Sequence, residues 1–185
     1  MTRFAPEAKR VYLLTGRPGS GKTTLLREVV AQTRLKAGGF YTEEIRIQGV
    51  RQGFQIVTLD GNSTILAHVD LHSSYHVSKY GVNLKELERV AIPAIRQAIR
   101  WRDLIVIDEI GKMELILPSF RKVVEEALES EKPVLGTIML KPHPWADELK
   151  RHPAVRVILV NRGNHAQVAH QVSEWLRSWR GSSSE

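Results

Sequence analysis

A phosphate-binding motif near the start of the chain constrains its fold more than any other sequence feature. Residues 16–23 read GRPGSGKT and fit the pattern G-x-x-x-x-G-K-[ST] at every fixed position. The preceding apolar run, residues 11–14, is typical of a short buried strand, and the apolar residues within 25–30 share one helical face. The order of strand, glycine-rich loop and helix predicts a phosphate-binding loop rather than a plain connecting turn.

The chemistry of this loop assigns roles to its residues. Glycines let successive backbone N–H groups point at an anion, and the N-terminus of the following helix adds its dipole. Lys22 is placed to reach the β- and γ-phosphates, and the Thr23 hydroxyl is placed to ligate a magnesium ion. The sequence therefore predicts nucleotide binding by Gly16, Arg17, Pro18, Gly19, Ser20, Gly21, Lys22, Thr23 and Thr24.

Two adjacent acids end a second apolar run, residues 103–109. Such a run predicts a buried parallel strand whose C-terminal end delivers carboxylates to the ligand-binding edge of an open α/β sheet. Asp108 is expected to hold the magnesium, usually through a water, and Glu109 to orient or deprotonate an attacking water. Because successive strand side chains point to opposite faces, we expect the two acids to have different roles.

Composition limits the classes of protein to which the chain can belong. Its 185 residues suit one domain, and it has no cysteine, which excludes disulfides and thiolate zinc sites. The first ten residues lack the apolar stretch of a signal peptide, and no apolar run reaches the ~18 residues of a membrane span. We expect a cytoplasmic monomer without membrane contact.

The net charge of +7 raises the question of a nucleic-acid partner. The lysines and arginines are scattered among acids along the chain, and no block of like charge stands out. A solvated basic surface that attracts polyanionic nucleotides is therefore expected, with no specific nucleic acid.

The rest of the sequence predicts an α/β fold with one irregular insertion. The first helix is expected to end at Gly38-Gly39, and three β-prone runs follow at residues 40–47, 53–59 and 64–68. The sequence Asp60-Gly61 between apolar runs is a hairpin signal, which favours an antiparallel meander after the first helix. We predict a P-loop NTPase fold with a mostly parallel sheet and helices on both faces, in a single domain of residues 1–180. Residues 181–185 are expected to be a disordered tail.

Later segments alternate between helical and strand patterns. A helical stripe covers residues 84–100, where Pro93 should kink or split the helix. Further elements are expected at residues 120–128 (helix), 133–140 (strand), 145–151 (helix), 155–160 (strand) and 168–179 (helix).

Two polar features allow more than one interpretation. The spacing of His68, His72 and His76 would align them on a helix as metal ligands, but their surroundings favour solvated loop histidines. Thr137 lies in a predicted strand and is either a γ-phosphate sensor or a threonine that the strand tolerates, which we favour.

Several segments of the sequence together resemble a known family. The chain resembles the THEP1 nucleoside-triphosphatases along nearly its whole length. The resemblance lies in the run DEIGKME that starts at Asp108, in the phosphate loop, and in residues 39–46, 79–82 and 134–138. The resemblance implies magnesium-dependent hydrolysis of ATP, GTP, CTP and UTP to diphosphate and phosphate, with low base selectivity. It adds Ile110 and Gly111 to the nucleotide-binding candidates, and Lys112 as a cation that stabilises γ-phosphate charge in catalysis beside Glu109 and Lys22.

The resemblance is incomplete after the last predicted strand. Family members tend to carry Asn-Arg there, whereas this chain has Asn164-His165, with Asn161-Arg162 slightly earlier. The role of this segment in nucleotide contact stays open.

Two other classes of function use the same phosphate loop. A small-molecule or polynucleotide kinase would add an acceptor pocket and an arginine-rich lid, for which Arg151 and Arg156 are the candidates in residues 141–156. A nucleotide-dependent switch protein would have to sense phosphates, because the guanine-reading Asn-Lys-x-Asp signature is missing. Phosphate release without an added acceptor separates the hydrolase from the kinase.

Overall fold

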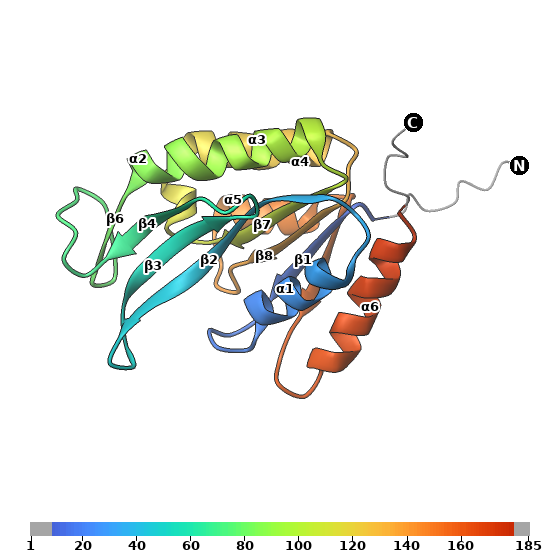
Figure 1. Ribbon diagram of the computed structural model, residues 1–185, viewed down its shortest axis with the longest axis horizontal. Helices are drawn as coiled ribbons and strands as arrows, with labels where there is room; N and C mark the ends of the chain where they lie inside the picture. The colour runs from blue at the N-terminus through green and yellow to red at the C-terminus, as the bar shows by residue number, and fades with distance from the viewer. Residues whose placement is uncertain (1–8, 180–185) are drawn as a thin grey trace, which may run out of the picture.

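A computed structural model describes residues 9–179, in which nine strands form one sheet in the order β5-β6-β4-β3-β2-β7-β8-β1-β9 (Figure 1). The expected tail, residues 181–185, lies outside the described residues. The strands are β1 (Val11–Thr15), β2 (Ala37–Ile47), β3 (Val50–Thr58), β4 (Ser63–His68), β5 (His76–Val77), β6 (Tyr80–Val82), β7 (Leu104–Ile110), β8 (Val134–Ile138) and β9 (Val155–Leu159). The helical elements are α1 (Lys22–Gln32), α2 (Leu84–Glu86), the π-helical η1 (Leu87–Ala91), α3 (Ile92–Trp101), the 3₁₀ turn η2 (Glu114–Ile116), α4 (Pro118–Glu129), α5 (Pro144–Arg151) and α6 (His165–Arg177).

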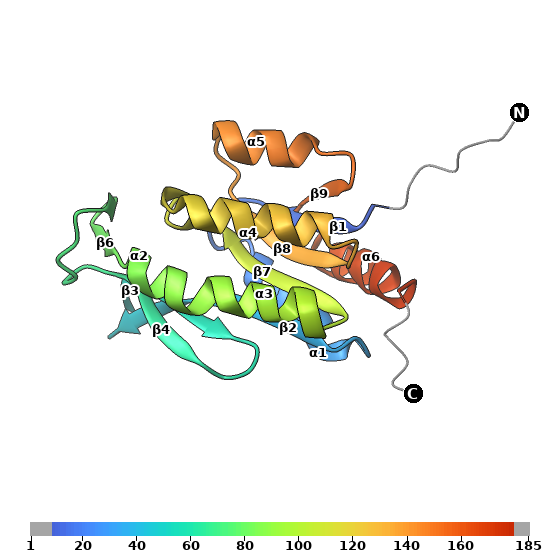
Figure 2. The same cartoon turned by 90° about the horizontal axis from the view of Figure 1, so that it is seen from above.

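The parallel half of the sheet carries helices on both faces, as predicted. Strand residues alternate between two cores: Val11 and Leu13 of β1 join the core under α3, α4 and α5, whereas Tyr12 and Leu14 join the core under α1 and α6. Figure 1 shows α3 and α4 above the sheet and α1 and α6 below it, and Figure 2 shows α5 on the same face as α4. The strands β2, β7, β8, β1 and β9 are parallel neighbours.

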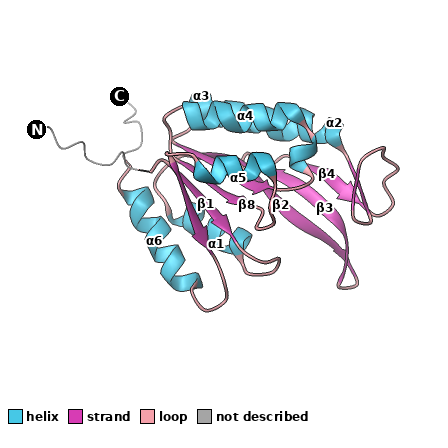
Figure 3. Cartoon of the chain, turned by 180° about the vertical axis from the view of Figure 1, so that it is seen from behind, coloured by secondary structure: helices cyan, strands magenta, loops and turns pink. Residues whose placement is uncertain are grey.

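The predicted meander is confirmed and grows directly out of the parallel sheet. Residues 37–40 of β2 pair in parallel with β7, and residues 40–47 pair antiparallel with β3, which in turn pairs with β4. Gln48 and Gly49 both have positive φ at the β2–β3 turn, the geometry of a tight hairpin. Figure 3 shows these strands extending beyond the helical layers.

The predicted end of the first helix is wrong. α1 ends at Gln32, where Thr33 is extended, and both Gly38 and Gly39 lie inside β2. A β-carbon on Gly39 would lie 1.9 Å from the carbonyl oxygen of Val106, so a glycine is needed here for close packing on β7 and not for a helix cap.

The helical run around Pro93 is split into a π-helical turn and an α-helix, as predicted, but the chain stays helical throughout. The π turn η1 comes directly before α3, and its last bond runs from the Ile92 N–H to the Leu87 carbonyl. A wider turn accommodates the proline ring while the chain stays helical.

Two of the three histidines lie in strands and not in a loop. His68 ends β4 and His76 begins β5, and His72 lies between them. Within residues 9–179, no group of three or more histidine, aspartate and glutamate side chains is arranged to hold a metal ion.

Over the same residues, no helix has the length and apolarity to cross a membrane.

Candidate functional site

The phosphate loop joins β1 to α1, as the motif predicts. Gly21 caps α1 in the left-handed region, with φ 87°, and the Leu25 N–H donates to the Gly21 carbonyl to start the helix. A β-carbon on Gly16 would lie 2.4 Å from the Val160 carbonyl oxygen, so the loop packs tightly on the segment after β9. Arg17, Pro18 and Gly19 are exposed at the loop tip, and Thr24 is exposed on the first turn of α1.

Lys22 lies back over its own loop. Its Nζ donates to the carbonyl oxygens of Gly16 and Arg17, each at 3.1 Å. These bonds keep the ammonium group above the loop, within the concavity that the backbone N–H groups form.

Asp108 is a buried carboxyl group on which four elements converge. It is 1% exposed at the end of β7, and its Oδ1 accepts a 2.5 Å hydrogen bond from the Thr137 hydroxyl of β8. The Thr42 hydroxyl of β2 donates to the backbone carbonyl of Asp108 at 2.6 Å. The Thr23 side chain of α1 lies close enough to the Asp108 carboxylate to lower its pKa. Burial raises the pKa of Asp108, and the bonds from Thr137 and Thr23 lower it in part. The two residues predicted to hold magnesium therefore lie in contact.

Thr137, which the sequence favoured as a threonine that the strand merely tolerates, contacts the candidate site. The threonine is fully buried, and its hydroxyl donates to Asp108. A strand pattern cannot indicate this contact, because it depends on β8 lying beside β7 in the sheet.

Removing this hydroxyl should destabilise the fold. Thr137→Val keeps the shape of the side chain but leaves a buried carboxylate oxygen without its donor, which is expected to lower the free energy of unfolding by about 1–3 kcal/mol. Urea denaturation measures the loss, and Thr137→Ser, which keeps the donor, is the matched control. A valine variant as stable as the wild type would contradict the prediction.

Glu109 lies next to Asp108 where the β-ladder is irregular. The β7–β8 register shifts between Ile107 and Ile110, so strict alternation of side chains does not hold across the two acids. Glu109 is half-buried, and burial raises its pKa, as does the charge of Asp108, while Lys22 lowers it. The predicted base and the phosphate-loop lysine are therefore close enough to interact.

The residues after Glu109 differ in what they offer a ligand. Ile110 is buried in the core, and its carbonyl already accepts the Met139 N–H, whereas Lys112 is exposed beside Gly111. The Gly111 N–H donates to Glu114 Oε2 at 3.1 Å. Glu114 is a second acid that the motif did not single out, although it belongs to the same run of sequence.

The segment at residues 161–165 lies against the phosphate loop. A β-carbon on Gly21 would lie 3.3 Å from Cδ2 of His165, the first residue of α6. The Val160 N–H also donates to the carbonyl of Thr15, the last residue of β1. Two segments far apart in the sequence are thus joined at the site.

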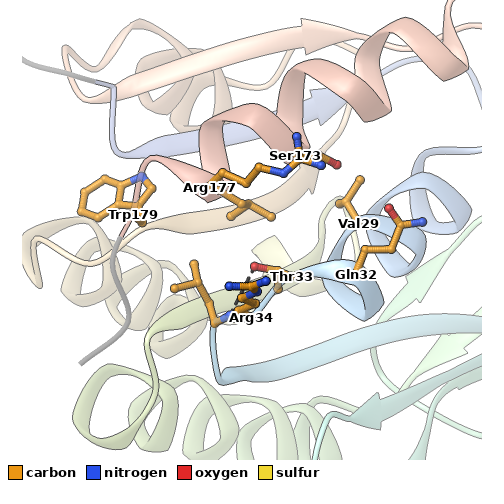
Figure 4. Close-up of a pocket in the computed structure, with 9 residues that line it drawn as sticks. Val29, Gln32, Thr33, Arg34, Ser173, Arg177 and Trp179 are labelled. Carbon is orange, nitrogen blue, oxygen red and sulfur yellow. Dashed lines mark hydrogen bonds between the residues drawn. The ribbon is translucent and has the colours of Figure 1, made fainter. Parts of the chain in front are cut away.

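A cavity of about 540 Å³ lies elsewhere, at the opposite end of α1 (Figure 4). Residues at the end of α1 and just after it line one side, and α6 with Trp179 lines the other. No residue of 16–24 or 108–112 lines it. An anion site built from backbone N–H groups at a sheet edge needs no enclosed cavity, so the site is identified by its donors and acids.

Comparison with known proteins gives one family throughout. A family model described as NTPase matches residues 11–173. The nucleoside-triphosphatase THEP1 of Thermotoga sp. (strain RQ2) is 46% identical over 169 residues, which cover 91% of this chain and 97% of that protein. The THEP1 protein of Korarchaeum cryptofilum is 38% identical over 179 residues, covering 92% and 91% of the two chains.

Solved structures give the same fold. The crystal structure of THEP1 from the hyperthermophile Aquifex aeolicus superposes with a TM-score of 0.83 at 35% identity, covering 90% of this chain and 98% of that one. The solution structure of a human cancer-related nucleoside triphosphatase gives a TM-score of 0.76 at 34% identity, covering 94% and 100%.

Proposed function

The chain belongs to the THEP1 family of nucleoside-triphosphatases, and from this we propose that it hydrolyses ATP, GTP, CTP and UTP to diphosphate and phosphate with magnesium at Thr23 and Asp108. The observation that carries the proposal is the approach of the Thr23 side chain of the phosphate loop to the buried Asp108 carboxylate of β7, whose pKa Thr23 lowers. It brings the two halves of a triphosphate site together.

The donors at this contact fit magnesium. Thr23 and Asp108 offer a hydroxyl and a carboxylate oxygen, the hard ligands that this ion prefers, and few protein ligands suffice because the ion keeps several waters. When bound, magnesium neutralises charge on the β- and γ-phosphate oxygens.

The chain's own residues supply the remaining chemistry. The backbone N–H groups of the phosphate loop, which Pro18 lacks, bind the phosphates, and Lys22 moves from its two loop carbonyls to the β- and γ-phosphates. Glu109 accepts a proton from the attacking water, a task that its raised pKa favours by bringing it nearer to neutrality. Lys112, exposed beside Gly111, stabilises charge on the γ-phosphate.

Low base selectivity is supported by the segment at residues 161–165. The Asn161 side-chain oxygen accepts the N–H groups of Gly163 and Asn164, and the Asn164 side chain bonds to the Asn161 N–H and the Leu159 carbonyl. Both side-chain oxygens and the Asn164 amide nitrogen are therefore engaged within the loop. Arg162 and His165 remain to contact the nucleoside, and a planar arginine stacks on any base.

A nucleotide panel tests the proposed function. Purified protein is incubated with each triphosphate and with or without magnesium, without any acceptor, and the products are resolved. Release of phosphate from all four nucleotides, only when magnesium is present, supports the proposal. Transfer to an acceptor in place of phosphate release would support a kinase.

Asp108→Asn should alter the dependence of activity on magnesium, because it weakens binding of the ion. The change removes the negative charge that faces the ion but keeps an oxygen that accepts the Thr137 hydroxyl. We expect the magnesium concentration for half-maximal activity to rise at least about 10-fold, the usual cost of altering a metal site. A magnesium titration measures this, with Asp70→Asn as control because its side chain is 88% exposed. An unchanged titration curve would remove Asp108 from the metal site.

We also propose that residues 1–180 act as one domain and as a cytoplasmic monomer without a specific nucleic-acid partner. The continuous nine-stranded sheet supports a single folding unit. Light scattering after size-exclusion chromatography tests the monomer.

A further inference from the structure

Glu114 is a buried acid to which the proposed hydrolysis assigns no role. It begins η2, five residues after Glu109, and is 3% exposed. Charged side chains are rarely buried without a partner or a task. Glu114 accepts a hydrogen bond from Gly111, and Glu109, the proposed base, also lies against Gly111.

Gly111 separates the two glutamates. The Gly111 N–H donates to Glu114 Oε2 at 3.1 Å. A β-carbon on Gly111 would lie 3.0 Å from that oxygen and 3.1 Å from Glu109 Oε1, so the two carboxyl oxygens are no more than about 6 Å apart. The absence of a side chain at residue 111 is what allows both acids to approach.

Burial and neighbouring charges change the pKa values of the two glutamates. Burial, followed by the charge of Glu109, raises the pKa of Glu114 to about 8, and Asp108 contributes in the same direction. Burial and Asp108 raise the pKa of Glu109, while Lys22 lowers it. Glu114 is the more deeply buried acid of the two, so burial disfavours its charged form most, and an uncharged glutamine is a close substitute for it.

We propose that Glu114 is a positioning residue for hydrolysis: through the Gly111 amide it fixes residues 109–111 and so holds the Glu109 carboxylate where it accepts the proton of water. The inference rests on the role proposed above for Glu109. Glu114 is 3% exposed, and its role in this proposal involves no contact with nucleotide or water. Its effect on turnover must therefore pass through Glu109.

Replacing Glu114 should lower kcat while nucleotide binding is kept. Glu114→Met fills the space but cannot accept the Gly111 N–H, and we expect kcat to fall about 10- to 100-fold, the usual effect of losing an outer-shell partner. Glu114→Gln has an uncharged acceptor of the same shape and should recover most of this loss. The Kd for a non-hydrolysable triphosphate should stay within about threefold in both variants, which also reports that each variant is folded.

A double-mutant cycle with Glu109→Gln separates positioning from a general structural effect. If Glu114 acts through Glu109, adding Glu114→Met to Glu109→Gln costs little further activity. Gly111→Ala tests the same geometry without changing either acid: its β-carbon would displace the two carboxyl groups by a few tenths of an ångström, and kcat should also fall. Glu148→Met, at an exposed position on α5, is the control.

Three results would overturn the inference: wild-type kcat in folded Glu114→Met, losses that multiply fully in the double variant, or no recovery with Glu114→Gln. Near-full activity of Glu109→Gln alone would instead reject the proposed base, and the inference with it. Should Glu114→Met fail to bind the analogue, Glu114→Gln and Gly111→Ala still decide, because wild-type kcat in Gly111→Ala contradicts the geometry.

Discussion

Glu109→Gln is expected to bind magnesium-nucleotide with near wild-type affinity and to lose about 10²- to 10⁴-fold in kcat, the usual contribution of a positioned general base. The glutamine keeps the shape of the side chain but cannot accept a proton from water. Because the lost interaction acts in the transition state, kcat and kcat/KM should fall together while nucleotide Kd is kept.

Single-turnover hydrolysis measures the rate of the chemical step, and titration with a fluorescent nucleotide measures the Kd. Glu148→Gln, an exposed glutamate on α5, is the matched control. If Glu109→Gln keeps near-full activity while Asp108→Asn loses it, another acid activates the water, and Glu114 or Glu43 is the next to test. Glu43 lies on β2 and is held by Arg27 and by Gln55, whose amide donates at 2.8 Å.

Lys22→Ala is expected to weaken triphosphate binding and nearly abolish turnover while the fold stays intact. The other donors of the phosphate loop are backbone N–H groups, so Lys22 supplies the full positive charge within it. The Lys22 side chain is half-exposed, and its Nζ bonds only two loop carbonyls. Losing Lys22 should therefore change the stability of the fold little.

The expected fall in kcat is at least about 10²- to 10³-fold, as for removing a preorganised charge-stabilising donor. Lys85→Ala, at an exposed position on α2, controls for a general loss of positive charge. Circular dichroism and thermal melts establish that the variant is folded. Unchanged turnover in folded Lys22→Ala would reject the phosphate loop as the catalytic centre.

Motifs whose chemistry is local could be predicted from the sequence, whereas contacts set by strand order could not. The phosphate loop and the acids of β7 depend on neighbours within a few residues, so their elements were predicted correctly. Thr42 and Thr137 reach Asp108 because β2 and β8 flank β7 in the sheet. Sequence spacing contains no information on this order.

The missed end of α1 has a related cause. Glycines often stop helices, and residues 33–36 include neither glycine nor proline, so Gly38-Gly39 was the strongest local stop signal. The constraint on Gly39 comes from the Val106 backbone, 67 residues away in the chain. The burial of Glu114 could not be predicted for the same reason, since it is a tertiary property.

The sheet order also determines when the nucleotide site forms as the chain folds. The strand that leads into the phosphate loop, β1, pairs with β8 and β9, two of the last strands to be synthesised, whereas β2, β3 and β4 pair with near neighbours in the chain. Contacts of short sequence separation cost less loop-closure entropy, so the meander can form early, while β1 must wait for residues 134–159. A nascent chain that lacks β8 and β9 thus has the complete motif but no rigid strand to hold it, and nucleotide stabilises the protein only after those strands have emerged from the ribosome.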